Sequence, residues 1–341
     1  LKKNIQKNQQ QVVLKNPEPL PKKLPGTVLL VVGETACRDY MPAFTPEYPW
    51  ETTPWESSVK GTKGFYFFPQ AYSCFSNTVM ALSQALTSSN QYNHVPLGEA
   101  ADLVSVAKKA GYHTYWFSSQ GKGKVWDAAI TTLANQADTR KWISWKHDGQ
   151  LLELLKTVPK GKNNFIVLHL NGSHYRYRDR VPQPFAQSHS FSQVPAEEGS
   201  FDTSLAYTDE VLRQVYQYGR NHLNLQVMVY LSDHGENMKY KHVSHPFSFD
   251  MVRIPLWIYL SPAYRTNYPW VEEALQAHEN TVFTNDLLFE TVSGLIQAQT
   301  NHYDPRYDFS HPDYAITKDN ARTMRGEYGI KEDPRLPMDA R

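Results

Sequence analysis

The sequence predicts an α/β fold, a three-layer sandwich in which helices cover both faces of a mainly parallel sheet. Short continuous apolar runs recur along the chain, and such runs are typical of strands buried on both faces. Helical patterns alternate with these runs, as they do in parallel α/β folds. Of the 341 residues, 40% are hydrophobic and 20% are charged, so the chain can bury a large core.

The predicted elements follow one another in a regular order. The first strand is the run TVLLVV at residues 27–32. Further strands are predicted at residues 64–68, 113–117, 165–170, 226–231 and 254–260. Helices are predicted at residues 78–87, 97–110, 149–157, 203–218 and 284–298. We expect functional side chains at the carboxyl ends of the strands, where open parallel sheets gather their functional groups.

The two ends of the chain differ in composition from the predicted α/β domain at residues 27–300. Residues 1–26 are polar and contain four closely spaced prolines, which predicts an extended linker. Because the chain opens on leucine rather than methionine, we expect that a preceding segment has been removed. Residues 301–341 are polar, aromatic and charged, and we expect them to wrap the surface of the domain.

Composition excludes several classes of function. The formal net charge is +1, so no global field attracts the chain to nucleic acid. Two cysteines are too few for a disulfide scaffold or a cysteine-built zinc site. No apolar run reaches the roughly 18 residues that span a bilayer. The 21 tyrosines and 8 tryptophans suit sugars and lipid headgroups, although aromatic residues most often pack in cores.

Polar residues follow two of the predicted strands. Glu34 comes just after the first strand, and Asp233-His234-Gly235 follows the strand at residues 226–231. Carboxylate oxygen and imidazole nitrogen are both zinc ligands, and the glycine allows a tight turn. Each feature alone has an ordinary alternative: a capping or salt-bridged glutamate, and an Asp–His pair that structures a turn. We expect them to converge because both lie at strand carboxyl ends.

Hydroxyl groups precede the helix predicted at residues 78–87. Thr78 stands at the helix start, after Ser73, Ser76 and Asn77. Free backbone N–H groups and the positive end of the helix dipole make such a position suitable for a phosphate. The alternative is a helix N-cap, which serine and threonine often provide.

Histidines complete the candidate site. His174 follows the strand at residues 165–170, while His242 and His245 follow the Asp-His-Gly-Glu turn. Neutral imidazole can hold a phosphate oxygen or transfer a proton near neutral pH. Most of the 13 histidines are expected to be structural, and we favour His174 and His245 because of their positions after polar, glycine-containing strand ends.

These motifs, GET at residues 33–35, SCFSNT at 73–78, HLNGSH at 169–174 and SDHGE at 232–236, occur in a recognisable order. In this order they resemble the bacterial phosphoethanolamine transferases of the alkaline phosphatase/sulfatase superfamily. The resemblance extends over residues 27–262 and implies an alkaline phosphatase-like fold. The Cys-x-Pro-x-Arg motif of sulfatases is absent, which argues against sulfatase activity.

The resemblance implies site residues as well as a fold. A zinc ion would be held by Glu34, Thr78, Asp233 and His234. Thr78 would be the nucleophile. His174 and one later histidine would contact the phosphate; His245 fits this second position better, and His242 remains the alternative.

The implied reaction transfers phosphoethanolamine from phosphatidylethanolamine to lipopolysaccharide, at lipid A or a core sugar, through a covalent intermediate on Thr78. Family members carry an N-terminal membrane domain, which implies a bacterial inner-membrane enzyme with its catalytic domain in the periplasm. The competing interpretations are a metal-dependent phosphatase or phosphodiesterase of the same superfamily, and a non-catalytic domain that binds lipid headgroups or glycans.

The cysteines give a further prediction. Cys37 and Cys74 each lie a few residues from a proposed zinc ligand, so convergence at the metal would bring them near one another. We therefore predict a disulfide between them, with two buried free thiols as the alternative. Lipid A transferases of the family often carry several disulfides, so the low cysteine number points to the branch that modifies core sugars.

Overall fold

The computed structural model describes residues 11–15, 25–122, 128–143 and 146–341. The predicted linker at residues 1–26 therefore lies mostly outside the described residues. Within it, Val12 is buried in the core and Leu14 pairs with Thr300. Among the described residues, no helix combines the length and the apolar character needed to cross a membrane.

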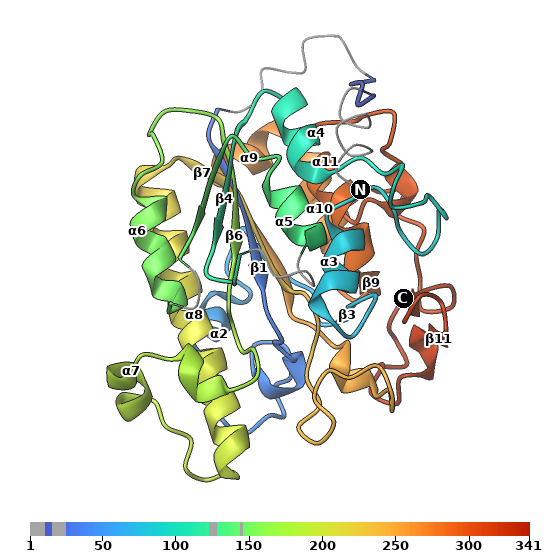
Figure 1. The fold of residues 1–341 in the computed structure, drawn as a ribbon. Helices are drawn as coiled ribbons and strands as arrows, with labels where there is room; N and C mark the ends of the chain where they lie inside the picture. Colours follow the sequence, from blue (N-terminus) through green and yellow to red (C-terminus); the bar gives the residue numbers. More distant parts are fainter. Residues whose placement is uncertain (1–10, 16–24, 123–127, 144–145) are drawn as a thin grey trace.

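A seven-stranded sheet forms the centre of the described part of the chain (Figure 1). Its order is β2-β8-β7-β1-β6-β4-β5. The strands are β1 Thr27–Gly33, β2 Phe65–Phe67, β4 His113–Ser118, β5 Thr139–Trp142, β6 Asn164–His169, β7 Leu225–Ser232 and β8 Leu256–Leu260. Neighbouring strands from β7 to β5 are parallel, whereas β8 runs antiparallel to both β7 and β2. The predicted α/β fold with a mainly parallel sheet is confirmed.

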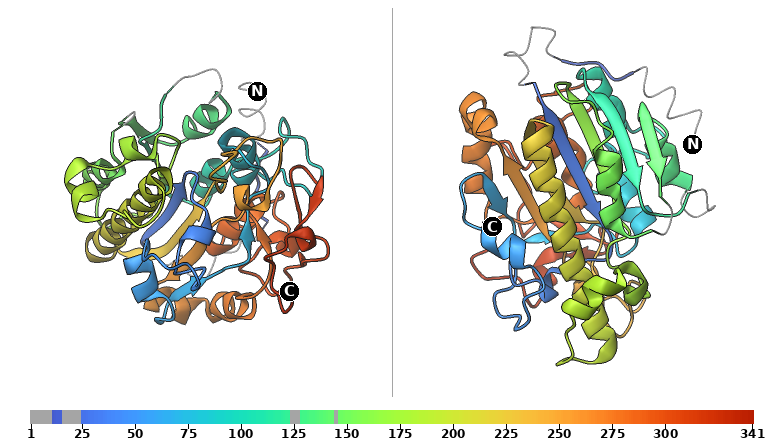
Figure 2. Two further views of the ribbon diagram at one scale, coloured as in Figure 1. Left: turned by 90° about the horizontal axis from the view of Figure 1, so that it is seen from below. Right: turned by 90° about the vertical axis from the view of Figure 1, so that its left-hand side faces the viewer.

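Helices cover both faces of the sheet, as the alternation of buried residues in β1 requires. Val28, Leu30 and Val32 face one core cluster, while Leu29 and Val31 face the other. The first face is covered by α3 Thr78–Ala85, α4 Leu103–Lys109, α5 Ala128–Ala134, α9 Pro262–Asn267, α10 Pro269–Ala277 and α11 Leu288–Leu295. The second is covered by α2 Pro54–Val59, α6 Leu151–Leu155 and α8 Ala196–His222, with α7 Gln183–Ser188 at its lower end (Figures 1 and 2).

Several boundaries differ from the predicted ones. The helix predicted at residues 97–110 begins at Leu103, because the Asp102 side chain accepts a hydrogen bond from the Ser105 N–H and caps it there. The helix predicted at 203–218 is longer, since α8 runs from Ala196 to His222. Strand β5 was not predicted; it lies at the sheet edge, where Arg140 and Lys141 are exposed and interrupt the apolar pattern.

Residues 301–341 run back over the first face of the domain. Phe309 is completely buried and packs edge-on against Phe68. The buried Arg253 side chain pairs with Asp333 and Asp39. Two small sheets complete this region: β3 Ala71–Tyr72 pairs with β9 Phe283–Thr284, and β10 Arg322–Thr323 pairs with β11 Tyr328–Gly329.

Candidate metal and nucleophile site

The carboxyl ends of β1 and β7 place three predicted metal ligands together. Gly33 of β1 is in register with Ser232 of β7, so the residues that follow, Glu34 and Asp233-His234, leave the sheet side by side. One ligand atom from each of these three side chains lies within 4.8 Å of the others, and all three side chains are buried. The convergence predicted from strand topology is therefore observed for these residues.

The hydrogen bonds of His234 determine which ring nitrogen faces the site. Its Nδ1 lies 2.8 Å from the Gly235 carbonyl oxygen, which can only accept, so Nδ1 carries the proton. Nε2 then faces Glu34 Oε1 and Asp233 Oδ2, each 3.4 Å away, where it can hold either a proton or a cation. A lone pair between two carboxylate oxygens is the arrangement of a ligand set that surrounds a cation.

The hydrogen bonds of the Asp233 carboxylate also indicate a cation site. Its Oδ1 accepts the N–H groups of Thr35 and His234, but its buried Oδ2 accepts no hydrogen bond from the described residues. The cationic neighbour of this oxygen is His234 Nε2, 3.4 Å away. A buried carboxylate oxygen that accepts no hydrogen bond is costly, and a bound cation would lower that cost.

The electrostatics of the three side chains point the same way. Burial and the nearby Glu34 carboxylate raise the pKa of Asp233 to about 7. Burial alone would lower the pKa of His234, but the two carboxylates raise it to about 10. Burial also acts to raise the pKa of Glu34, but the hydrogen bond and charge of His234 hold it below its usual range. Without metal, the imidazole therefore binds the proton that substitutes for a cation.

The donor set fits zinc. Two carboxylate oxygens and one imidazole nitrogen come from Glu34, Asp233 and His234, and Thr78 adds a hydroxyl oxygen. Thr78 Oγ1 lies 3.1 Å from Glu34 Oε2 and 3.4 Å from His234 Nε2. Four oxygen and nitrogen donors suit the tetrahedral coordination that zinc prefers.

Thr78 is the first residue of α3, but it does not cap this helix. Asn77 does so, because its Oδ1 accepts the Met80 N–H at 3.1 Å. The Thr78 hydroxyl is thereby left to face the metal ligands, and its residue is only half-buried, so that a substrate can reach it. The N-cap interpretation therefore applies to Asn77 and not to Thr78.

The loop before α3 is tied to the metal ligands by Asn285, at the end of β9. The Asn285 side chain accepts the Cys74 N–H and donates to the Asp233 carbonyl oxygen, each at 2.8 Å. Ser73 Oγ donates to the same carbonyl at 2.6 Å. These bonds hold the loop before α3 against the loop that follows β7.

Sequence reasoning missed Gln120, which follows β4. Its Nε2 lies 2.9 Å from Glu34 Oε2 and 2.9 Å from the Leu170 carbonyl oxygen. Gln120 therefore orients the glutamate on the side opposite His234. Its position just past the carboxyl end of a predicted strand was a signal that could have found it.

Gly172 brings the loop that bears His174 against Glu34. A Cβ at this position would lie 2.7 Å from the Glu34 carbonyl oxygen, and the backbone has φ of +49°. Glycine is therefore required here both by the close approach and by the left-handed conformation. The next residue, Ser173, donates its N–H to the same carbonyl at 2.9 Å.

Ring distances place two of the predicted phosphate-binding histidines near His234. The His242 ring lies 4.8 Å from the His234 ring and 6.0 Å from the His174 ring, between centroids. His242 is half-buried, whereas His245 is exposed. The ring distances thus place His242 beside His234 and His174 beside His242.

A buried carboxylate orients His242. Glu236 is completely buried, and its carboxylate oxygens lie 3.3 and 3.4 Å from His242 Nδ1. Tyr177 donates its hydroxyl to Glu236 Oε2 at 2.9 Å and fixes the carboxylate. With Nδ1 turned to Glu236, His242 keeps Nε2 for another partner.

The predicted disulfide is wrong, because Cys37 and Cys74 are buried free thiols. Cys37 packs into the core cluster on the α8 face of the sheet. The sulfur of Cys74 instead points toward the Ala81 carbonyl oxygen of α3, 3.9 Å away. The convergence of Glu34 and Thr78 therefore did not bring the two sulfurs together. Burial raises the pKa of both thiols, which makes them unreactive.

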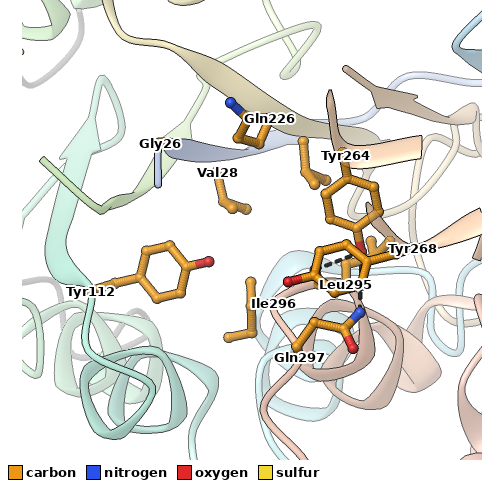
Figure 3. A pocket seen from close by; sticks show the side chains of 10 residues that line it. Gly26, Val28, Tyr112, Gln226, Tyr264, Tyr268, Leu295, Ile296 and Gln297 are labelled. Atoms are coloured by element: carbon orange, nitrogen blue, oxygen red, sulfur yellow. Dashed lines mark hydrogen bonds between the residues drawn. The ribbon is translucent and has the colours of Figure 1, made fainter. Parts of the chain in front are cut away.

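A small cavity lies at the opposite end of β1 (Figure 3). It is lined by side chains around Gly26, Val28 and Tyr112, and its volume is about 10 Å³. That volume holds no more than about one water molecule. This cavity is therefore too small for a phosphate ester.

Comparison with known proteins gives a family match over most of the chain. The family model described as Sulfatase matches residues 26–298. Phosphoethanolamine transferase OpgE of Escherichia coli K12 is 30% identical over 223 residues, which cover 61% of this chain and 39% of OpgE. The putative transferase YhbX of the same strain is covered to 43%, so the chain spans less than half the length of these relatives.

Solved structures share the fold. The C-terminal periplasmic domain of EptC from Escherichia coli, also crystallised in a complex with Zn, aligns with a TM-score of 0.76 at 22% identity and covers 91% of this chain and 94% of that one. The integral membrane lipooligosaccharide phosphoethanolamine transferase A of Neisseria meningitidis aligns with a TM-score of 0.68 at 19% identity. This alignment covers 88% of the present chain and 60% of the Neisseria protein.

Proposed function

The chain belongs to the sulfatase family, and on this premise we propose that it is the catalytic domain of a zinc-dependent phosphoethanolamine transferase with Thr78 as its nucleophile. The observation that carries the proposal is the position of Thr78. Its hydroxyl stands at a helix start, accessible to substrate, 3.1 and 3.4 Å from two residues of a buried Glu–Asp–His cluster. OpgE and EptC, which bear the name phosphoethanolamine transferase, support the choice of transferred group.

Zinc held by Glu34, Thr78, Asp233 and His234 would lower the pKa of the threonine hydroxyl and stabilise negative charge on the phosphoryl oxygens. The Zn complex of the EptC domain supports zinc as the metal.

The proposed reaction has two steps, which begin with attack by Thr78. Thr78 Oγ1 attacks phosphorus in line, and its nearest acceptor for the proton is Glu34 Oε2 at 3.1 Å. The bond from phosphorus to the glycerol oxygen of phosphatidylethanolamine breaks, and diacylglycerol leaves with a proton. An acceptor hydroxyl of lipopolysaccharide next attacks the same phosphorus and gives its proton to the group that protonated diacylglycerol. The bond from phosphorus to Thr78 Oγ1 then breaks, and Glu34 returns the proton to Thr78.

In this scheme His174 and His242 bind the phosphoryl group and protonate the leaving oxygen. Both rings lie beside the metal ligands, and Glu236 holds His242 so that Nε2 faces away from the carboxylate. We assign to them contacts with the phosphoryl oxygens and proton donation to the leaving oxygen. We choose His242 over His245 for this role because the His242 ring lies 4.8 Å from the His234 ring.

The location of the reaction follows from the substrates. A diacyl lipid donor stays in its bilayer, so we place residues 27–300 as a catalytic domain in the periplasm, at the outer face of the inner membrane. Residues 1–26 would be the linker to a membrane domain, and residues 301–341 an extension packed on the catalytic domain. The integral membrane relative from Neisseria meningitidis supports this arrangement.

The test uses the 341-residue chain, zinc and a short-chain, soluble phosphoethanolamine ester. Quenched reactions should yield a peptide in which Thr78 carries phosphoethanolamine, and addition of a lipopolysaccharide core saccharide should discharge it to that saccharide. Thr78→Ala is the control and should show no labelled peptide. Labelling at another residue would overturn the nucleophile assignment, and discharge to water alone, with acceptor present, would favour a phosphodiesterase.

A further inference from the structure

Two loops at the carboxyl edge of the sheet form one surface beside the metal ligands. Residues 174–180 follow β6, residues 237–245 follow β7, and together we call them the rim (Figures 1 and 2). His174 and His242 belong to these loops, with ring centroids 6.0 Å apart. The Lys241 ammonium lies over the rings of Tyr175 and Tyr177, at 5.8 and 5.5 Å, and joins the loops.

The rim concentrates positive charge. It contains three arginines, two lysines and one aspartate, which gives a net charge of +4 with neutral histidines and leaves −3 on the rest of the +1 chain. Arg176, Arg178 and Lys239 are exposed. Lys241 is compensated by Glu197 at 2.8 Å, so the uncompensated charge is carried mainly by the exposed residues.

The rim also concentrates exposed apolar surface. Seven large hydrophobic side chains are exposed among the described residues, and three of them, Tyr175, Tyr240 and Val243, belong to the rim at 49%, 39% and 47% exposure. Aromatic side chains with a polar edge, interspersed with lysine and arginine, are the composition that sits at the headgroup level of a bilayer. A sugar-binding groove would instead enclose its aromatic residues.

The backbone holds these side chains outward. The Asn237 side chain accepts the N–H groups of Lys239 and Tyr240 at 2.9 and 2.7 Å, and Asn237 pairs with Lys241 across the turn. Arg180 donates to the carbonyl oxygens of His174 and Tyr175. Local hydrogen bonds therefore fix the conformation of both loops of the rim.

We propose that the rim docks on the surface of an anionic phospholipid bilayer, with Tyr240 and Val243 at headgroup depth and Arg178 and Lys239 against lipid phosphates. Such docking would hold the metal ligands, which lie behind the rim, at the membrane surface. It rests on the charge and exposure of the two loops and does not depend on which group the enzyme transfers.

The test measures co-sedimentation of the 341-residue chain with vesicles of phosphatidylcholine, with and without phosphatidylglycerol. Binding should require phosphatidylglycerol and weaken as salt rises above about 0.15 M. The double variant Arg178→Glu/Lys239→Glu should bind at least about 30-fold more weakly, since loss of each basic residue removes about fivefold and the two glutamates add repulsion from the anionic surface. The variant Tyr240→Ser/Val243→Ser should also bind more weakly.

The matched control reverses the same amount of charge at the other end of the sheet. Lys109, at the end of α4, and Lys162, just before β6, are exposed, so Lys109→Glu/Lys162→Glu should leave vesicle binding unchanged. All variants should keep wild-type turnover of a soluble phosphoethanolamine ester, which checks folding and separates docking from chemistry. Equal binding by rim and control variants would overturn the proposal. So would rim variants that bind vesicles normally but lose transfer to a phosphorylated saccharide.

Discussion

Substitution of Thr78 by alanine should separate the proposed catalytic role of this residue from the stability of the protein. The two roles of a polar side chain at a helix start fall on neighbouring residues: Asn77 caps α3, and Thr78 faces the metal ligands. Paired substitutions at the two positions should therefore have opposite effects.

The expected magnitudes follow from these contacts. Thr78→Ala keeps the cap and introduces the best helix former, so the free energy of unfolding of the metal-free protein should change by less than about 1 kcal/mol. Loss of the nucleophile should lower kcat/KM by at least about 10⁴-fold, or roughly 5.5 kcal/mol of transition-state stabilisation. Asn77→Ala should instead cost about 1 kcal/mol of stability, or about 2 °C in Tm, and keep most of the activity.

The assay combines turnover of a soluble phosphoethanolamine ester with denaturant unfolding of the same preparations. Thr78→Ser retains a hydroxyl and should recover measurable turnover. If Thr78→Ala kept more than about one hundredth of wild-type kcat/KM, the attack by Thr78 would be refuted. If Asn77→Ala lost as much activity as Thr78→Ala in a folded protein, the division of roles would be wrong.

Three further predictions concern the metal and the ion pairs. Chelation should abolish turnover and lower Tm, because a metal that binds only the folded state stabilises it, and added zinc should restore both; full activity after exhaustive chelation would contradict the metal site. Gln120→Ala should weaken zinc binding by about 10- to 100-fold, measured by chelator competition, with near-normal kcat at saturating zinc, because it removes the 2.9 Å hydrogen bond to Glu34; unchanged affinity would count against the positioning role. Burial acts to raise the pKa of Asp333, but the hydrogen bond and charge of Arg253 hold it below its usual value. The Arg253–Asp333 pair therefore contributes its full stabilisation above the ordinary carboxyl pKa, and this stabilisation is lost as the pH falls through the lowered pKa. Asp333→Asn should thus cost about 3 kcal/mol at pH 7 and progressively less in acid, measured by denaturant unfolding; a cost independent of pH would reject the ionic explanation.

The layers of the fold could be predicted from sequence because buried strands leave a simple signal. The runs at residues 27–32 and 226–231 are apolar on both faces, and both became central strands. The direction of β8 could not be predicted, since residues of a strand covered on both faces are apolar whether it runs parallel or antiparallel. The edge strand β5 carries Arg140 and Lys141 toward solvent, and such a strand resembles a loop in sequence.

The candidate site was predictable to the extent that strand topology determines it. Glu34, Asp233 and His234 could be placed together because parallel strands end at one edge. The choice between His242 and His245 depends on how the loop after β7 folds back, and Asn237 and Glu236 determine this through side-chain hydrogen bonds that no spacing rule contains. The disulfide prediction failed for a related reason. Proximity of two backbone segments does not determine on which face of the sheet each cysteine side chain packs.

The bracing of the nucleophile loop by distant residues has a consequence for the order of folding. Thr323 donates its hydroxyl to the Ser73 carbonyl oxygen, and Met324 donates its N–H to the Cys74 carbonyl oxygen, across about 250 positions of sequence. Contacts of such separation close late, because the entropy of the intervening chain must be lost first. During synthesis, the loop that precedes Thr78 would therefore remain incomplete until the segment around residue 323 has emerged. A chain released early should keep the central strands and lack these two hydrogen bonds, so that the loop before Thr78 would not yet be held in place.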